Sequence, residues 1–317
     1  MSALRTRATL LGCLAIVLWA TNSAATVRLV RHLGPLTALM LVNGLAGLVL
    51  AVLGDLRRRR LGACLCVGWR FGLIGGACFV GYQFLFFLAF AWAPPGLALP
   101  LNLVNYLWPS LTVVLALLVA RAAYRVRPGL LVLGLLIGLG GVVVTLVGNA
   151  AAPGLSAAFL SCPAAFVAMF AAAIGWAVFS VVVVPLRAPT AASGTPLFFL
   201  ATALVAACAR PWSGEAFAWP TDLWSMELGP VILFAALVPT AGGYLLWELA
   251  AQHGELPLLG ALSNALPVLS SAVLWCMVGN GTGGARIAAG ALLVCGGAYL
   301  VHRSVRRVAA GEGIPAS

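Results

Sequence analysis

One short segment gathers side chains that could bind a small molecule, within a chain made mostly of Leu, Ala, Val and Gly. It is NLVNYLWPS, residues 102–110. Asn105, Trp108 and Thr112 have the i, i+3, i+7 spacing of one helical face. An amide can hydrogen-bond a solute, and an indole ring can stack on another ring or face a cation. Pro109 lacks an N–H and therefore frees a backbone carbonyl about one turn earlier, near Asn105.

Other side chains of the same kinds lie in hydrophobic runs elsewhere. Tyr82 with Phe86, and Trp176 with Ser180, are spaced i, i+4, and the second half of the chain repeats the first cluster as Ser263, Asn264 and Pro267. We predict that a cavity is lined by Trp19, Tyr82, Asn105, Trp108, Trp176, Tyr244 and Asn264. For each residue alone, a polar contact between two helices or a ring filling a gap is the competing interpretation.

Glu248 is the acid placed most clearly within an apolar run, where it shares a helical face with Tyr244 and Trp247. An ionisable group inside a membrane span is a functional candidate, so Glu248 is a possible proton-coupling residue. It could equally lie about one turn from the cytoplasmic end of its helix as a solvated carboxylate. Both interpretations stay open at this stage.

Catalytic, metal and cofactor sites are not expected. The eight cysteines are scattered, and the three histidines lie far apart, so no ligand cluster with metal-site spacing occurs. No nucleophile, base and metal constellation indicates an enzyme. The longest polar loop, 210–228, is too short for a soluble domain, and no phosphate-binding G-x-x-x-x-G-K-[ST] motif occurs.

Composition places the chain in a membrane. It has 317 residues, of which 63% are hydrophobic and 8% charged, with a mean hydropathy of +1.09. Apolar runs long enough to cross the hydrocarbon layer recur along its length. We predict ten helices at about 8–27, 35–54, 71–92, 96–119, 129–149, 163–184, 195–209, 229–251, 257–279 and 285–302. The N-terminal run has some features of a signal peptide, but the internal repeat counts it as a structural helix.

The net charge of +11 orients the helices rather than indicating a nucleic-acid partner, because the arginines lie between the hydrophobic runs. Most of them fall on the N-terminal side of the membrane in the ten-helix arrangement. By the positive-inside rule, both termini are then cytoplasmic. Trp19, Trp108 and Trp176 lie away from the two membrane surfaces, where tryptophans usually form belts.

An internal repeat appears when the chain is compared with itself at a shift of about 157 residues. Trp19 aligns with Trp176, Pro109 with Pro267, and GLLIGLGG with GALLVCGG. We predict an all-α protein of two five-helix repeats, 1–150 and 151–317. Since each repeat has an odd number of spans, the second enters the membrane inverted. Inverted repeats with a site between them are the plan of many secondary transporters.

The combination of LWATNSA, NLVNYLWP and GGYLLWELAAQHG resembles the drug/metabolite transporter superfamily, EamA type, over essentially the whole chain. The resemblance implies export of aromatic amino acids and related metabolites across a bacterial inner membrane. It also implies a central cavity lined by Tyr82, Trp108 and Trp176, with Asn105 and Tyr244 nearby. Related chains can carry an uncharged polar residue where this one has Glu248, so no role is transferred to it.

We therefore expect a monomeric exporter of aromatic or other hydrophobic amino acids that works by alternating access, as facilitated diffusion. The alternative is a drug or metabolite exporter of another substrate class, with proton antiport through Glu248. The absence of an arginine at mid-depth argues against phosphorylated substrates. A channel would need a filter built by a symmetric assembly. The expected partners are a small-molecule substrate and the lipid bilayer.

Overall fold

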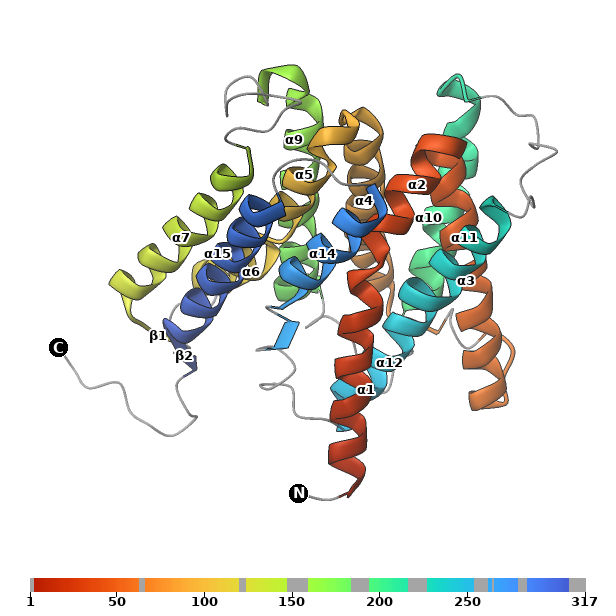
Figure 1. Ribbon diagram of the computed structural model, residues 1–317. Helices are drawn as coiled ribbons and strands as arrows, with labels where there is room; N and C mark the ends of the chain where they lie inside the picture. The colour runs from red at the N-terminus through yellow and green to blue at the C-terminus, as the bar shows by residue number, and fades with distance from the viewer. Residues whose placement is uncertain are drawn as a thin grey trace.

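The structure is a computed structural model that describes residues 3–62, 66–119, 124–146, 159–183, 194–215, 227–253, 262–263, 265–278 and 284–307. These residues form helices, apart from one small antiparallel sheet (Figure 1). The helices of the first half are α1 (Ala3–Ala20), α2 (Asn22–Leu33), α3 (Pro35–Arg58), α4 (Trp69–Trp92), η2 (Pro95–Leu97), α5 (Ala98–Asn105), α6 (Trp108–Val119) and α7 (Pro128–Leu146).

The second half contains α9 (Pro163–Val178), η4 (Phe179–Val183), α10 (Thr195–Ala209), η6 (Arg210–Trp212), α11 (Leu228–Ala235), η7 (Ala236–Gly242), α12 (Gly243–His253), α14 (Leu266–Val278) and α15 (Gly284–Arg303). The strands are β1 (Tyr124–Val126) and β2 (Val305–Arg307), which pair antiparallel. The pairing places Arg125 opposite Arg306, so a segment after α6 lies against the segment after α15.

Eight helical segments of the described residues are long and apolar enough to cross a membrane. They are Arg5–Leu33, Pro35–Arg58, Trp69–Trp92, Ala98–Val119, Pro163–Val182, Thr195–Trp212, Leu228–Ala250 and Gly284–Arg303. Two shorter apolar helices, Pro128–Val144 and Leu266–Met277, lie where the other two spans are predicted. The predictions of an all-α fold and a multi-pass membrane protein are confirmed, while the arrangement as two inverted halves stays a prediction.

The first and fourth predicted helices are interrupted rather than continuous. The first extends further than expected and breaks at Thr21, whose hydroxyl donates to the Leu18 carbonyl at 2.7 Å. The fourth breaks at Tyr106 and Leu107, between α5 and α6. Pro109 has no N–H for the Asn105 carbonyl, and the chain tightens instead, with Leu107 N–H donating to the Val104 carbonyl at 3.1 Å.

Two further helices widen into π-helical turns. One is η4, which continues α9 at its C-terminal end. The other is η7, which joins α11 to α12 and contains Pro239. The Thr240 hydroxyl donates to the Ala235 carbonyl at 2.7 Å and so satisfies a backbone group that the widened turn leaves available. Such turns inside helices are frequent at functional sites.

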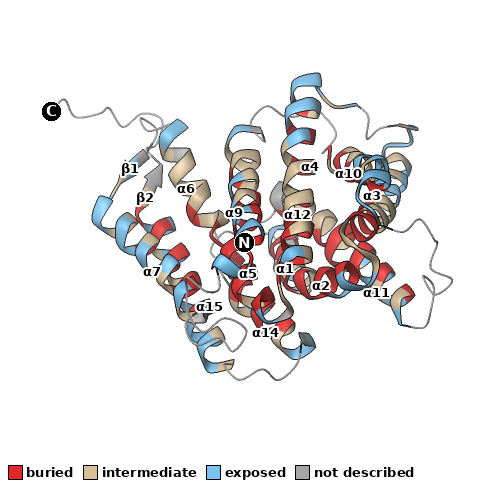
Figure 2. Cartoon of the chain, turned by 90° about the horizontal axis from the view of Figure 1, so that it is seen from above, coloured by how far each residue is buried: buried red, intermediate tan, exposed pale blue. Residues whose placement is uncertain are grey.

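Helices far apart in sequence pack in pairs. The most extensive contacts join α7 with α15, α3 with α10, α4 with α9, and α1 with α12. Figure 1 shows α7 and α15 side by side at one edge, and glycines allow their backbones to approach closely. Seen from above in Figure 2, buried residues gather on the central helices such as α2, α5 and α14, while α7 turns exposed residues outward.

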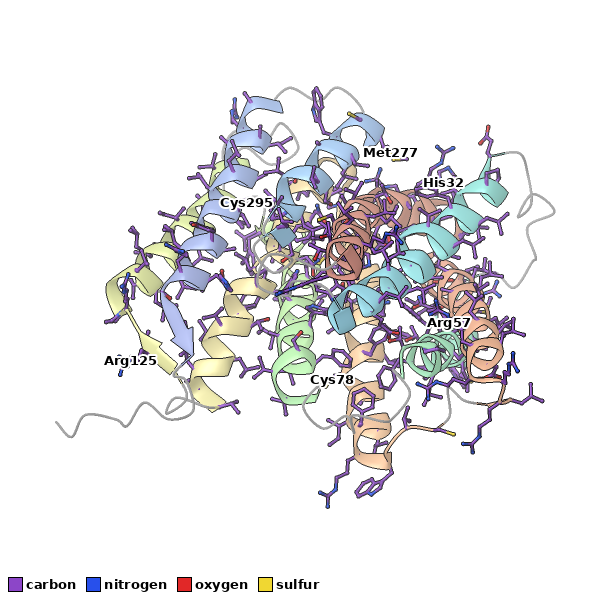
Figure 3. The ribbon with its side chains drawn as sticks, turned by 90° about the horizontal axis from the view of Figure 1, so that it is seen from below. His32, Arg57, Cys78, Arg125, Met277 and Cys295 are labelled. Carbon is purple, nitrogen blue, oxygen red and sulfur yellow. The ribbon has the colours of Figure 1, made fainter. Side chains whose placement is uncertain are left out.

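The ends of several elements with arginines lie toward one face. The start of α1, the end of α3 and the β1–β2 pair all lie in the lower part of Figure 1. In the view from below, Arg57 and Arg125 lie at the periphery of the molecule (Figure 3). At the opposite end of α3, Glu215 accepts hydrogen bonds from the N–H groups of Leu36 and Thr37 at 2.9 and 3.0 Å. This carboxylate caps the N-terminus of α3.

Candidate functional site

A cavity of about 220 Å³ lies among the interrupted helices. It is lined by residues of α1, α2, α3, α4, α5, α6, α9, η4, η7, α12 and α14, together with Tyr106 in the α5–α6 break and Ser263 before α14. Its lining consists of Trp19, Asn22, Ser23, Val42, Asn43, Tyr82, Gln83, Phe86, Phe87, Asn105, Tyr106, Trp108, Trp176, Ser180, Pro239, Thr240, Tyr244, Trp247, Ser263 and Leu266. Residues from both halves of the sequence therefore meet at one hollow.

Aromatic rings form one wall of the cavity, with Trp176 at its centre. The centroid of the Trp176 ring lies 5.0 Å from that of Tyr82, 6.3 Å from Tyr244 and 6.4 Å from Trp108. The centroid of the Trp19 ring lies 5.3 Å from that of Tyr244, and the two ring planes meet at 70°. These separations fall in the range of favourable edge-to-face and offset ring pairs, so the rings support one another while exposing surface to the cavity.

A second set of rings fixes the position of the first. The Phe79 ring is buried behind the wall, with its centroid 6.1 Å from that of Tyr244 and 6.3 Å from that of Trp176. Phe199 of α10 packs against Tyr244 with a centroid separation of 5.0 Å. The lining rings are thus held by buried neighbours that do not themselves line the cavity.

Amides and hydroxyls supply polar groups to the cavity wall. The Gln83 side-chain amide donates to Asn43 Oδ1 at 3.3 Å, and Asn43 donates to the Leu39 carbonyl at 3.0 Å. The Ser23 hydroxyl donates to Asn102 Oδ1 at 2.7 Å, and Asn102 donates to the hydroxyl of Ser270 at 3.0 Å. The second chain of bonds links α2, α5 and α14 at buried positions.

Two buried polar atoms of lining residues have no hydrogen-bond partner in the described part of the chain. One is Oδ1 of Asn105, a residue that is 6% exposed at the end of α5. The other is Nε1 of Trp19, which lies close to the backbone of Gly243. Because nearly all buried polar groups in proteins are paired, these two atoms mark positions where a ligand or water would be expected.

None of the described lining residues carries a charge. The nearest acid in sequence to a lining ring is Glu248, which follows Trp247 on α12. Its carboxylate accepts a hydrogen bond from the Thr195 hydroxyl at 2.7 Å, at the start of α10. Glu248 therefore joins α12 to α10 and is not part of the cavity lining.

Six of the seven predicted binding residues are brought together in this cavity: Trp19, Tyr82, Asn105, Trp108, Trp176 and Tyr244. The seventh, Asn264, lies outside the described residues, although its neighbour Ser263 contributes to the lining. Thr112 does not line the cavity, because the break between Asn105 and Trp108 interrupts the helical face, and its hydroxyl donates to the Trp108 carbonyl. The role of these residues in binding stays a prediction.

Sequence reasoning did not select several polar lining residues, namely Asn22, Ser23, Asn43 and Thr240. Asn22 and Ser23 follow Trp19 by one turn, and Asn43 is a lone amide in the apolar run of α3. The cost of burying an amide in hydrocarbon is a signal that could have identified Asn43. Among the described residues, no group of three or more His, Cys, Asp or Glu side chains could hold a metal ion.

The apolar spans, together with a ring-lined cavity whose described lining carries no charge, indicate a multi-pass membrane transporter. No protein-family model matches the chain. Curated relatives do match it, over nearly the whole of both sequences. The aromatic amino acid exporter YddG of Ancylobacter novellus is 32% identical over 304 residues, covering 96% of this chain and 99% of the relative. The protein of the same name from Salmonella typhimurium is 30% identical, covering 95% of this chain and 98% of the relative.

The chain belongs to the YddG family of exporters, within the drug/metabolite transporter superfamily. Escherichia coli YddG, also named an aromatic amino acid exporter, is 28% identical over 306 residues. A solved crystal structure with 28% sequence identity matches with a TM-score of 0.67 and covers 94% of this chain and 98% of its own. These relatives are named transporters and not enzymes, which confirms the predicted class of protein.

Proposed function

We propose that this protein exports aromatic and other hydrophobic amino acids, with related metabolites, across a bacterial inner membrane. It works as a secondary transporter by alternating access, and solute moves down its own gradient. The observation that carries the proposal is the ring-lined cavity, whose described lining carries no charged side chain and comes from both halves of the sequence. The names of the curated relatives support the same substrate class.

The chemistry of the wall suits an aromatic side chain. Each additional ring pair contributes about 0.5–1.5 kcal/mol beyond area burial, so a solute ring lying against Trp176 and Tyr82 would gain from both. An amino acid brings no net charge into a described lining that has no charged side chain, and its ammonium group can face amide oxygens and ring faces, which attract cations. A phosphorylated solute would need cationic partners, and the described lining has none.

Repeated interruptions support two inverted repeats, residues 1–150 and 151–317. The break at Thr21 in the first half has its counterpart at the start of η4, Phe179, about 157 residues later. The start of α6 at Trp108–Pro109 has its counterpart at the start of α14, Leu266–Pro267. Helix breaks therefore recur at nearly the shift at which the sequence itself repeats.

Close contacts between the two halves also recur at nearly this shift. An ideal Cβ on Gly134 would lie 2.8 Å from the Gly297 carbonyl oxygen, and one on Gly141 would lie 2.5 Å from that of Gly290. Adding 156 to Gly134 gives 290, and subtracting 156 from Gly297 gives 141, so each contact maps onto the other. A two-fold axis relating the halves produces such reciprocal pairs.

The ring pairs join corresponding helices, although Tyr244 follows Tyr82 by 162 residues while Trp176 follows Trp19 by 157. Trp176 of α9 faces Tyr82 of α4 with a centroid separation of 5.0 Å, and Trp19 of α1 faces Tyr244 of α12 with one of 5.3 Å. In the proposed repeat, α1 corresponds to α9 and α4 to the helix that ends in α12. Two arrangements of one half against the other then open the cavity to opposite sides of the membrane in turn.

We place both termini in the cytoplasm and propose that the monomer is functional. The arginine-bearing ends of α3, β1 and β2 lie toward the same face as the start of α1, which agrees with the positive-inside rule (Figure 1). Both halves of the chain contribute to the described lining, which supports a cavity formed within a monomer.

Proton antiport through Glu248 is the competing mechanism, and its position favours uncoupled transport. The carboxylate accepts a hydrogen bond from Thr195 and does not reach the cavity lining. A coupling carboxylate would be expected to exchange between solute and proton at the site itself. Another substrate class for the same cavity is tested by widening the panel of labelled solutes in the experiment that follows.

The test is counterflow of labelled phenylalanine into liposomes that contain the purified protein and unlabelled phenylalanine. We expect saturable counterflow, and a loss of at least about tenfold in kcat/KM for Trp176→Ala, since this ring contacts three other lining rings. Trp212→Ala is the matched control, because that tryptophan is 84% exposed at the end of α10. No saturable counterflow by the folded wild type would refute the proposal.

A further inference from the structure

Asn105 places an unused hydrogen-bond acceptor on the cavity wall. The residue is 6% exposed, and its Oδ1 atom has no partner among the described residues. Two other amides of this wall are engaged with each other, since the Gln83 amide donates to Asn43 Oδ1 at 3.3 Å. A buried oxygen without a donor is unfavourable in the empty site and is stabilised when a ligand supplies an N–H group.

The backbone adds a second acceptor at the same residue. In a continuous helix the Asn105 carbonyl would accept from the N–H of residue 109, but residue 109 is proline and has none. The helix breaks immediately after Asn105, at Tyr106 and Leu107. The Asn105 carbonyl therefore lacks its usual donor from residue 109, in the same residue as the unpaired Oδ1, and an ammonium group has three N–H donors for such acceptors.

The surroundings favour a cation over an anion. Trp108 begins the next helix three residues after Asn105, and its ring packs edge-on to that of Trp176. Ring faces attract an ammonium group by cation–π interaction, most strongly where water is excluded. The described lining holds no charged side chain of either sign, so the ring faces and amide oxygens, which attract cations, set the preference.

We propose that Asn105 forms a subsite for the primary ammonium group of the solute. The cavity then selects aromatic compounds that carry an amine, including aromatic amines without a carboxylate, and rejects aromatic acids that lack the amine. The inference rests on the proposed function because it assigns the substrate chemistry of the same cavity. It extends the substrate class to decarboxylated relatives of the amino acids.

Equilibrium binding to the purified, full-length protein tests the subsite with three probes that share one ring: phenylalanine, phenethylamine and 3-phenylpropionate. The wild type is expected to bind the two amines within about tenfold of each other and the acid at least about tenfold more weakly. Asn105→Leu should weaken both amines by about 10- to 100-fold, the usual effect of losing a hydrogen bond to a charged group, and leave the acid unchanged.

Thr112→Val is the control on the next helix, because the Thr112 hydroxyl bonds to the Trp108 carbonyl and not to the cavity. It should leave all three affinities unchanged. Asn105→Asp retains an acceptor and adds a negative charge, so it should favour phenethylamine over phenylalanine by about tenfold or more. Asn105→Asp tests the subsite even if Asn105→Leu does not fold. If the folded Asp variant does not bind phenethylamine more tightly than phenylalanine, the subsite is overturned.

The two proposals fail separately. Phenylalanine counterflow by the wild type, combined with unchanged discrimination in folded Asn105→Leu, would overturn the subsite and leave the export function intact. Binding of phenethylamine that depends on Asn105, in a protein that gives no phenylalanine counterflow, would support the subsite and overturn amino acid export. Stronger binding of 3-phenylpropionate than of phenethylamine by the wild type would also overturn the subsite.

Discussion

The glycine contact between α7 and α15 can be tested by adding a single methyl group. A Cβ added to Gly141 would lie 2.5 Å from the Gly290 carbonyl oxygen and 2.9 Å from the Val294 backbone nitrogen. Real Cβ atoms essentially never approach another heavy atom within 3.0 Å, so the helices must separate by at least about 0.5 Å. These two contacted atoms belong to the backbone, and no side-chain rotation can relieve the overlap.

The adjacent glycine is a matched control. At Gly140, a Cβ would meet no atom within 4 Å. Both substitutions to Ala gain the same helix propensity, about 1 kcal/mol, so the difference between the two variants isolates the steric cost. Overpacking typically costs about 1–3 kcal/mol, and we expect Gly141→Ala to be less stable than Gly140→Ala by that amount.

Thermal unfolding in detergent, followed by the loss of the monodisperse size-exclusion peak, measures the difference. Gly141→Ala should melt several degrees below Gly140→Ala. On the facing helix, Gly297→Ala and Gly296→Ala should differ in the same direction, because a Cβ on Gly297 would lie 2.5 Å from the Gly138 backbone nitrogen and one on Gly296 meets nothing within 4 Å. Equal melting temperatures within both pairs would refute the close packing of α7 on α15.

Two further substitutions address the cavity and the acid beside it. Gly243→Ala should raise the KM for phenylalanine counterflow, because its Cβ would lie 2.6 Å from Nε1 of Trp19 and would displace that ring. An unchanged KM in liposomes would contradict the placement of Trp19. Glu248→Gln should leave counterflow and its pH profile unchanged, because the amide oxygen can still accept the hydrogen bond from Thr195. Glu248→Ala removes this hydrogen bond and should destabilise the protein by about 0.5–1.5 kcal/mol. Loss of pH dependence in the Gln variant would instead support proton coupling.

Tryptophans inside the apolar runs pointed to the cavity lining from the sequence alone. Trp19, Trp108 and Trp176 cannot belong to the interfacial belts if the apolar runs are read as spans, and the structure places all three on the cavity. Trp69 and Trp212, which lie at helix ends, are 72% and 84% exposed. Tryptophan position is informative because the amphipathic indole has a strong preference for the interface.

Contacts between distant segments could not be predicted in the same way. The bonds from Ser23 to Asn102 and from Asn102 to Ser270 depend on the mutual placement of three helices, which no local pattern specifies. Helical spacing likewise grouped Glu248 with Tyr244, but Glu248 contacts Thr195 while Tyr244 lines the cavity. Periodicity identifies a face only approximately, and packing decides which neighbour each side chain meets.

Interrupted helices and the cavity are two aspects of one physical requirement. A break leaves backbone N–H and C=O groups unpaired, and in the hydrocarbon layer only protein, trapped water or a solute can satisfy them. Every interruption described above accordingly contributes to the lining: Asn22 after the first, Tyr106 in the second, Ser180 in η4, Thr240 in η7 and Leu266 at the start of α14. Thr, Pro and paired amides within apolar runs, recurring at a constant shift, therefore indicate where such a transporter keeps its binding cavity.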